Sequence, residues 1–205
     1  MILCHNRKFA VLHNPKTGSV TVSHVFRNQT LDENKHDHVV YSNPDYRLFS
    51  FFRDPVERYI SAFNYIKRLH YSAIELLHYF YGEKISCAKV MPYDEFTEDQ
   101  KNKIDNVSPI QYFDHFVAKK CGGIPFAFQT YWLDRPNMTL LDYRNFDMEL
   151  TRLCKEFDFE PDLIPRMNES RSRHKVSDLI EDEYNKIANF YQQDYDFLRK
   201  SKIDI

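Results

Sequence analysis

The sequence predicts an α/β protein with a mostly parallel central sheet flanked by helices. Three apolar runs, at 8–13, 46–52 and 139–143, have the length and composition of buried strands, and they alternate with helical patterns. Such alternation favours a parallel sheet, because each helix returns the chain to the same end of the sheet. Since no linker or repeat interrupts the chain, we expect a single domain over residues 1–205.

The first strand-to-helix connection is rich in polar residues. The strand KFAVLH is ended by Asn14-Pro15, and the turn-like KTGS precedes a segment with apolar residues at helical spacing. Ser19 is the expected N-cap of that helix. The loop presents backbone N–H groups at a helix N-terminus, where Gly18 allows close approach of a ligand and Lys16 supplies a positive charge. The alternative interpretation is an ordinary capped helix with an exposed lysine.

The second connection contains the strongest local signal for a helix start. In DPVE, Asp54 suits the N-cap, Pro55 the first helical position and Glu57 the reciprocal side of a capping box. Arg53 leaves the preceding strand beside this helix N-terminus, where its planar guanidinium can bind a phosphate. The alternative makes Arg53 a surface cap. We interpret Arg58 as the i+4 salt-bridge partner of Asp54.

Further helical patterns complete the alternation of strands and helices. They cover residues 108–119, 145–157 and 182–199. The stretch 28–45 is polar and is expected to be irregular.

Composition excludes several functional classes. The 28 basic and 30 acidic residues give a formal net charge of -2, so any anion site must be local, and we expect no nucleic-acid partner. No apolar run has membrane-spanning length and no signal-peptide core is present, which predicts a soluble, cytoplasmic chain without a membrane partner. The four scattered cysteines indicate reduced thiols. The four glycines fit neither GxGxxG nor GxxxxGK[ST], which excludes the usual nucleotide-binding fingerprints.

Together, the two connections resemble the nucleotide-binding signature of sulfotransferases that use 3′-phosphoadenosine 5′-phosphosulfate (PAPS). PKTGS with its trailing hydroxyls is similar to the 5′-phosphosulfate loop of that family, and RDPVERYIS is similar to its 3′-phosphate motif, with Arg53 and Ser61 at the family's spacing. The resemblance is to the carbohydrate sulfotransferase branch, which includes the heparan sulfate 2-O-sulfotransferases, and to its small microbial or viral relatives. Weaker matches at FAFQTYWL, LLDYRNF and LIPRMNESR extend it over nearly the whole chain.

The resemblance implies a P-loop-like three-layer sandwich, with PAPS as donor and 3′-phosphoadenosine 5′-phosphate (PAP) as product. It assigns binding of this nucleotide to Pro15, Lys16, Thr17, Gly18, Ser19, Val20, Thr21, Arg53, Ser61, Ser170 and Arg171. Val20 stands where many members carry Ser or Thr, which removes a side-chain donor and leaves the backbone N–H. We therefore expect weaker affinity for the nucleotide rather than a lost site.

The polar stretch between the two connections supplies candidates for a general base. HDHV places His36 and His38 there and resembles an HxH segment of the 2-O-sulfotransferases, in which histidine is the proposed base. A histidine pKa of about 6.5 suits removal of a hydroxyl proton near neutral pH. Lys16 is expected to stabilise charge on the leaving phosphate, and no metal ion is expected. The alternatives are surface histidines without a role and a metal site, for which no further ligand cluster is present.

Two later segments each have two interpretations. The polar stretch that contains Asn168, Ser170, Arg171 and Arg173 either closes over the 3′-phosphate or is a solvated loop before the last helix. The segment from Gln129 to Trp132 either lines the acceptor cleft or packs in the core, as dense aromatic residues more often do.

The function that the sequence favours is transfer of a sulfuryl group from PAPS to an acceptor hydroxyl, on a saccharide, by in-line attack with a histidine base. The acceptor is expected to be a small molecule or a glycan. A kinase for a small molecule or nucleotide, with an irregular P-loop, is one alternative, and it lacks an evident acidic magnesium ligand after a strand. A non-catalytic nucleotide-binding module is the other, and it would not depend on His36 or His38.

Overall fold

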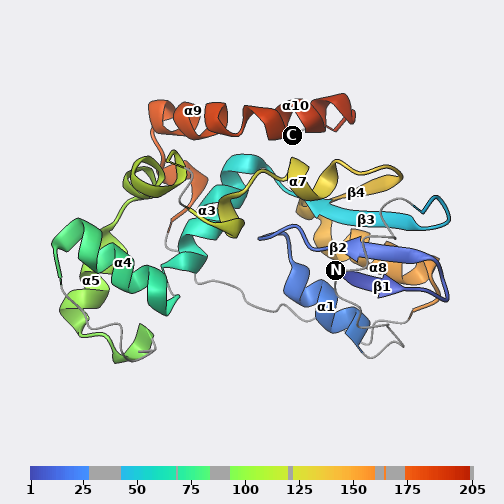
Figure 1. Ribbon diagram of the computed structural model, residues 1–205, viewed down its shortest axis with the longest axis horizontal. Coiled ribbons are helices and arrows are strands. Elements are labelled where there is room, and N and C mark those ends of the chain that lie inside the picture. The colour runs from blue at the N-terminus through green and yellow to red at the C-terminus, as the bar shows by residue number, and fades with distance from the viewer. Residues whose placement is uncertain are drawn as a thin grey trace. The chain divides into compact units, whose positions relative to one another are not determined.

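The computed structural model describes residues 1–27, 43–67, 69–83, 93–119, 122–159, 164 and 174–203 (Figure 1). The chain forms two compact units. The first unit consists of Met1–Arg58, Ala127–Glu169 and Tyr191–Ile205, and the second of Tyr59–Phe126 and Ser170–Phe190. Each unit therefore combines segments that are distant in sequence. The single domain expected over residues 1–205 stays a prediction.

Within the described residues, the first unit is built on a four-stranded sheet. Its strands are β1 (Ile2–Cys4), β2 (Phe9–Leu12), β3 (Arg47–Phe52) and β4 (Met138–Asp142), in the order β1-β2-β3-β4. The strands β2, β3 and β4 are parallel neighbours, and β1 runs antiparallel to β2 at the edge. The predicted α/β class, the mostly parallel sheet and all three predicted strands are confirmed. The edge strand β1 is an addition to them.

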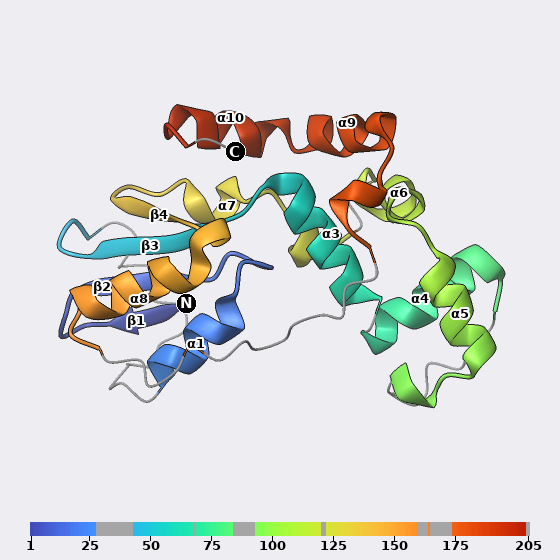
Figure 2. The same cartoon turned by 180° about the vertical axis from the view of Figure 1, so that it is seen from behind.

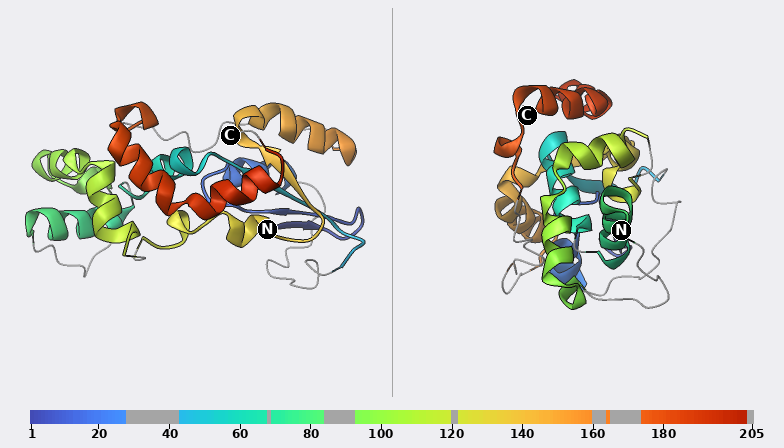
Figure 3. Two further views of the ribbon diagram at one scale, coloured as in Figure 1. Left: turned by 90° about the horizontal axis from the view of Figure 1, so that it is seen from above. Right: turned by 90° about the vertical axis from the view of Figure 1, so that its left-hand side faces the viewer.

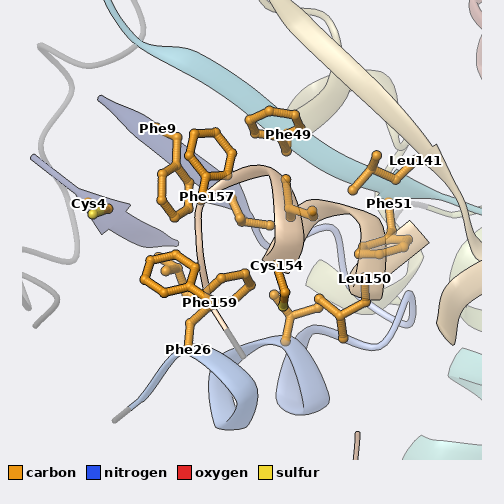
Figure 4. Close-up of a cluster of buried hydrophobic side chains, with 14 residues drawn as sticks. Cys4, Phe9, Phe26, Phe49, Phe51, Leu141, Leu150, Cys154, Phe157 and Phe159 are labelled. Atoms are coloured by element: carbon orange, nitrogen blue, oxygen red, sulfur yellow. The ribbon is translucent and has the colours of Figure 1, made fainter. Parts of the chain in front are cut away.

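Helices α1 (Ser19–Arg27) and α8 (Phe146–Glu156) cover one face of this sheet (Figure 2). Alternate residues of each strand face these helices, as the two-residue period of a strand requires. Aromatic rings fill the layer between sheet and helices (Figure 4). The rings of Phe9 and Phe157 stack with centroids 4.0 Å apart, and Phe26 of α1 packs against Phe9 at 5.9 Å. Burial of such large apolar side chains is the main stabilising contribution of this layer.

Helices α7 (Thr130–Leu133) and α10 (Gln192–Lys200) pack on the other face, beside each other (Figure 3). Leu133 of α7 and Leu198 of α10 are fully buried in one cluster with Phe52 of β3. Phe51, which precedes Phe52 on β3, belongs to the cluster on the opposite face of the sheet, under α8. The first unit thus has helices on both faces of its sheet, as expected from the sequence.

Helix α3 (Pro55–Ile66) begins where the DPVE signal places it. Oδ1 of Asp54 accepts a hydrogen bond from the N–H of Glu57 over 2.8 Å, so the predicted N-cap is confirmed. The helix begins in the first unit, and from Tyr59 onward it belongs to the second unit.

The described part of the second unit is helical. Its described α-helices are the later part of α3, α4 (His70–Tyr81), α5 (Glu98–Asn106), α6 (Pro109–Tyr112) and α9 (Glu181–Phe190). Helix α6 passes directly into a π-helical turn, Phe113–Val117, so the helix expected over 108–119 is present with a change of winding. The hydroxyl of Tyr59 donates to the Pro109 carbonyl over 2.6 Å and joins α3 to α6 within this unit.

Two helix boundaries differ from the prediction. Ser19 is the first helical residue of α1 rather than its N-cap, because the first backbone bond of the helix runs from Val22 N–H to Gly18 C=O over 3.0 Å. The helix expected over 182–199 is interrupted at Tyr191, whose side chain is fully buried, and it forms the two helices α9 and α10.

Candidate functional site

The carboxyl ends of β2, β3 and β4 bring three connections to one edge of the sheet. These strands are parallel neighbours, so the segments that follow them emerge on the same side. The segments are the loop 13–18 before α1, the turn Arg53-Asp54 before α3, and Tyr143 after β4. Ligands of open parallel sheets bind beyond this edge, which makes it the candidate site.

Buried hydrogen bonds anchor the loop 13–18. Asn14 is fully buried, and its Nδ2 donates to the Phe51 carbonyl over 2.9 Å, which ties the loop to β3. Thr17 is also buried, and its hydroxyl donates to the Asn14 carbonyl over 2.7 Å. The Thr17 hydroxyl therefore closes the loop around Lys16.

Gly18 is required both by backbone conformation and by packing. Its φ of +79° lies in the left-handed region, which favours glycine. A Cβ at this position would lie 2.4 Å from Cε2 of Phe146, the first residue of α8. The sequence favours a glycine here for close approach of a ligand, and the structure adds a protein ring that faces the position of the missing side chain.

Lys16 occupies a strained, half-buried position in this loop. Its φ of +69° lies in the left-handed region, which costs a non-glycine residue roughly 1 to 2 kcal/mol. Burial, followed by the positive charge of Arg53, lowers the pKa of Lys16 to about 8. Backbone strain and a perturbed pKa at one lysine are typical of functional sites. An anion at this helix N-terminus would relieve the repulsion between the two cations.

Contacts on three sides fix Arg53. Its Nε donates to Oε2 of Glu57 over 3.3 Å, and its guanidinium carbon lies 4.8 Å from the ring centroid of Tyr143. The backbone of Arg53 is bound by the side chain of Gln129. Only 21% of the Arg53 side chain is exposed, and the residue that caps α3 is Asp54. Arg53 is therefore a positioned cation rather than a surface cap.

Gln129 is a residue whose role the sequence did not reveal. The sequence places it either in an acceptor cleft or in the core, and the structure places it in the core, fully buried. Its Oε1 accepts from Asn14 Nδ2 over 2.8 Å as well as from the N–H of Arg53 over 3.1 Å. The only sequence signal was a single amide among aromatic residues.

The structure places Arg58 in the interior of the protein. Its side chain is fully buried, and Nη2 donates to the Ala127 carbonyl over 2.5 Å. The guanidinium carbon lies 5.7 Å from the ring centroid of Tyr191. Burial lowers the pKa of Arg58, and the neighbouring Tyr191 and Asp194 oppose that shift. One turn into α3 the helix surface faces the protein interior, so the i+4 position is unavailable for a solvent-exposed pair.

The remaining predicted residues lie on the loop, on α1 or on α3, or fall outside the described part of the chain. Pro15 and Ser19 are partly buried, Val20 is 47% exposed and Thr21 is buried. Ser61 is partly buried on α3, in the part that belongs to the second unit. Outside the described residues lie His36, His38, Asn168, Ser170, Arg171 and Arg173.

His13 is a further titratable group of the loop. Its Nε2 lies 3.2 Å from Oγ of Ser23, and its Nδ1 lies 3.2 Å from the amino nitrogen of Met1. Burial, followed by the positive charge of that amino group, lowers the pKa of His13 to about 4. His13 is therefore uncharged near neutral pH.

The described residues contain no group of three or more His, Cys, Asp or Glu side chains that could hold a metal ion. None of the helices within those residues is long and apolar enough to cross a membrane.

A cationic loop and an arginine turn at the carboxyl ends of parallel strands define an α/β protein suited to a phosphate- or sulfate-bearing ligand. The family model described as Sulfotransferase family matches residues 1–200, and the chain belongs to this family. Members of the family are transferases of sulfuryl groups that generally use PAPS and act on a small-molecule or glycan acceptor. Comparisons with curated proteins and with solved structures found no match.

Proposed function

We propose that this protein transfers a sulfuryl group from PAPS to an acceptor hydroxyl on a saccharide. The observation that carries the proposal is the position of Lys16 and Arg53, which follow neighbouring parallel strands, where the positive charge of Arg53 adds to burial in lowering the pKa of Lys16. Two cations on separate connections suit a nucleotide with phosphate groups at two positions. The saccharide acceptor is proposed on the resemblance of the two motifs to the carbohydrate branch.

The two connections are proposed to bind different ends of the nucleotide. Backbone N–H groups, hydroxyls and the Lys16 ammonium suit the 5′-phosphosulfate, because they converge at the N-terminus of α1. The residues assigned to this end are Pro15, Lys16, Thr17, Gly18, Ser19, Val20 and Thr21. Arg53 and Ser61 are assigned to the 3′-phosphate, for which guanidinium offers a forked pair of donors. Ser170 and Arg171 are proposed to add contacts there.

The proposed reaction is an in-line displacement at sulfur. His36 or His38 takes the proton of the acceptor hydroxyl as that oxygen forms its bond to sulfur. The bond from sulfur to the 5′-phosphate oxygen breaks, and PAP leaves with that electron pair. Lys16 and the N-terminus of α1 stabilise the charge on the leaving oxygen.

The carboxylates at the strand ends favour this function over that of a kinase. A kinase needs acidic ligands for magnesium near the transferred phosphate. Asp54, which follows β3, caps α3, and Asp142, which ends β4, forms an ion pair with Arg144 over 2.7 Å. Both carboxylates thus have protein partners in place of a metal ion.

Thermal unfolding with three nucleotides tests the donor. A ligand at about 100 times its Kd contributes about 2.7 kcal/mol to stability, so PAP should raise Tm clearly. AMP should raise Tm much less, because it lacks the 3′-phosphate. Equal shifts with PAP and AMP would remove Arg53 and Ser61 from the 3′-phosphate site, and a larger shift with ATP-Mg would favour the kinase.

Transfer of label from PAPS to a panel of sugars, glycans, phenols and amines tests the reaction. We expect a labelled saccharide. Binding of PAP without transfer to any acceptor would instead support the non-catalytic module. We also propose that residues 1–205 act as one sulfotransferase domain, since the family match spans segments of both units.

A further inference from the structure

One buried side chain, that of Gln129, links the loop 13–18 to the turn at Arg53. Its Oε1 accepts from Asn14 Nδ2 over 2.8 Å and from the Arg53 N–H over 3.1 Å, and its Nε2 donates to the Arg53 carbonyl over 2.8 Å. The amide therefore binds the backbone of Arg53 on both sides while it also binds the loop. Gln129 is fully buried, so these bonds form without competition from solvent.

Gln129 is itself fixed by α10. The backbone N–H groups of Gln129 and Thr130 donate to the two oxygens of Asp194 over 2.9 Å and 3.0 Å. Asp194 is fully buried, and bonds from N–H groups to a carboxylate are among the stronger hydrogen bonds of proteins. The position of Gln129 at the start of α7 is thus determined by a second element rather than by its own loop.

We propose that Gln129 is a positioning residue for the sulfuryl donor, because it sets the separation between the loop that carries Lys16 and the backbone of Arg53. The proposal rests on the proposed function. The 5′ and 3′ groups of the nucleotide have a separation fixed by one ribose, so their two binding sites must keep a matching separation. In this role the side chain of Gln129 does not need to contact the nucleotide.

The distribution of bonds predicts which half of the site depends more on Gln129. Two of its side-chain bonds go to Arg53, whereas the loop keeps a separate bond from Asn14 to the Phe51 carbonyl over 2.9 Å. Loss of the amide should therefore disturb Arg53 more than the loop. A purely structural role would lower stability without changing the preference for a 3′-phosphate.

The test compares PAP and AMP affinities of the full chain by calorimetry. The variant Gln129→Met keeps the side-chain length and removes all three bonds, and the PAP-to-AMP affinity ratio should fall about tenfold or more. The matched control is Thr130→Val, which removes the partly buried bond from Gln193 Nε2 to Thr130 Oγ1 and the side-chain bond between Thr130 and Asp194, and leaves the backbone bonds of Gln129 and Thr130 to Asp194. The control should be less stable with an unchanged ratio.

A double-mutant cycle shows whether Gln129 acts through Arg53. In an Arg53→Ala background, Gln129→Met should leave the PAP-to-AMP ratio unchanged, because the arginine whose position it sets is gone. An equal fall of the ratio in both backgrounds would overturn the proposal. If Gln129→Met does not fold, Gln129→Glu keeps the accepting oxygen and loses the donation to the Arg53 carbonyl, and the same cycle applies.

The outcomes separate this inference from the proposed function. A wild-type chain that binds PAP no better than AMP would contradict the proposed 3′-phosphate site itself, and the inference with it. A wild-type preference for PAP that persists in folded Gln129→Met would overturn the positioning role alone.

Discussion

The hydroxyl of Tyr195 on α10 donates to Oδ2 of Asp54 over 2.9 Å, while Oδ1 of the same carboxylate accepts from the Glu57 N–H over 2.8 Å. Asp54 thus caps α3 and anchors α10, although 141 residues separate it from Tyr195. The preceding residue, Arg53, contacts Glu57 and Tyr143 at the edge of the sheet. Stability and ligand binding are therefore assigned to adjacent residues.

Substitution of these two neighbours should separate affinity from stability. Arg53→Ala should weaken PAP binding by about 1.5 to 3 kcal/mol, the scale of a set of charge-assisted hydrogen bonds, with a small change in Tm. Asp54→Ala should lower the free energy of unfolding by about 2 kcal/mol, because the helix cap and the bond to Tyr195 are lost together. Calorimetry with PAP and denaturant unfolding measure the two effects.

The control is Tyr195→Phe, which keeps the cap. It should lower the free energy of unfolding by about 1 kcal/mol, since one partly buried hydrogen bond is lost, and PAP affinity should not change. A variant Arg53→Ala that unfolds readily but binds PAP normally would make Arg53 a structural residue.

We expect Lys16 to take up a proton when PAP binds at mildly alkaline pH. Its pKa of about 8 in the free protein is lowered by burial and by Arg53, so part of the population is neutral at pH 8.5. A bound phosphate raises that pKa again, and the phosphates of PAP are already ionised there, with a second pKa of about 6. Calorimetry in buffers of different ionisation enthalpy should show uptake of more than about half a proton.

The matched variant for this measurement is Lys16→Met, which should bind PAP more weakly and without proton uptake at the same pH. Affinity of the wild-type chain should also fall as pH rises above 8, because the neutral amine attracts the phosphate less. Equal proton uptake in both proteins would assign the titration to another group.

The strands and the main helix start were predictable because local chemistry determines them. The apolar run at 46–52 has the length of a buried strand, and Asp54 offers an oxygen where α3 needs one. The strand β1 (Ile2–Cys4) was not predictable, since three residues carry no periodicity and the strand exists through its pairing with β2.

Within the site, the charged residues were predictable, but the buried residues that hold them in position were not. Lys16 and Arg53 stand at strand-helix turns in the sequence, whereas the role of Gln129 depends on contacts with Asn14 and Asp194 that only the fold creates. The same reason explains why the burial of Arg58 was not predictable. An i+4 spacing identifies a neighbour along a helix but does not say which face of the helix is buried.

His13 should make stability depend on pH between neutrality and pH 4. Its pKa of about 4 lies below the usual 6.5, so the unfolded chain takes up a proton first and folding becomes less favourable as pH falls. Above pH 6.5 this contribution is fully present, and below about 4 it is lost. Between pH 7 and pH 5 the free energy of unfolding should fall by about 2 kcal/mol more in the wild type than in His13→Gln.

Denaturant unfolding of the two proteins at several pH values measures this difference. The effect of pH on the carboxylates is the same in both proteins, so it cancels when their free energies of unfolding are subtracted. Parallel pH profiles would mean that His13 titrates normally. A steeper loss of stability in His13→Gln would contradict the assigned sign.

Lys16 and the histidine pair should differ in which step they affect. In the proposed mechanism Lys16 contacts the donor before and during the reaction, so Lys16→Ala should reduce PAPS affinity and turnover together. A general base acts only in the chemical step, so replacement of the responsible histidine by Ala should cut turnover by about 10² to 10⁴ with near-normal PAP binding. His36 is the first candidate, and His38 is tested beside it because side chains at i and i+2 can share one face.

The comparison requires PAP affinity and acceptor turnover for His36→Ala, His38→Ala and Lys16→Ala. The control is His24→Ala, which removes an exposed histidine of α1 and should change neither quantity. Near-normal turnover in both members of the pair would place the base elsewhere in the protein. Loss of PAP binding in both would instead assign them to the nucleotide site or to the fold, because a base that acts only on the acceptor leaves the bound product unaffected.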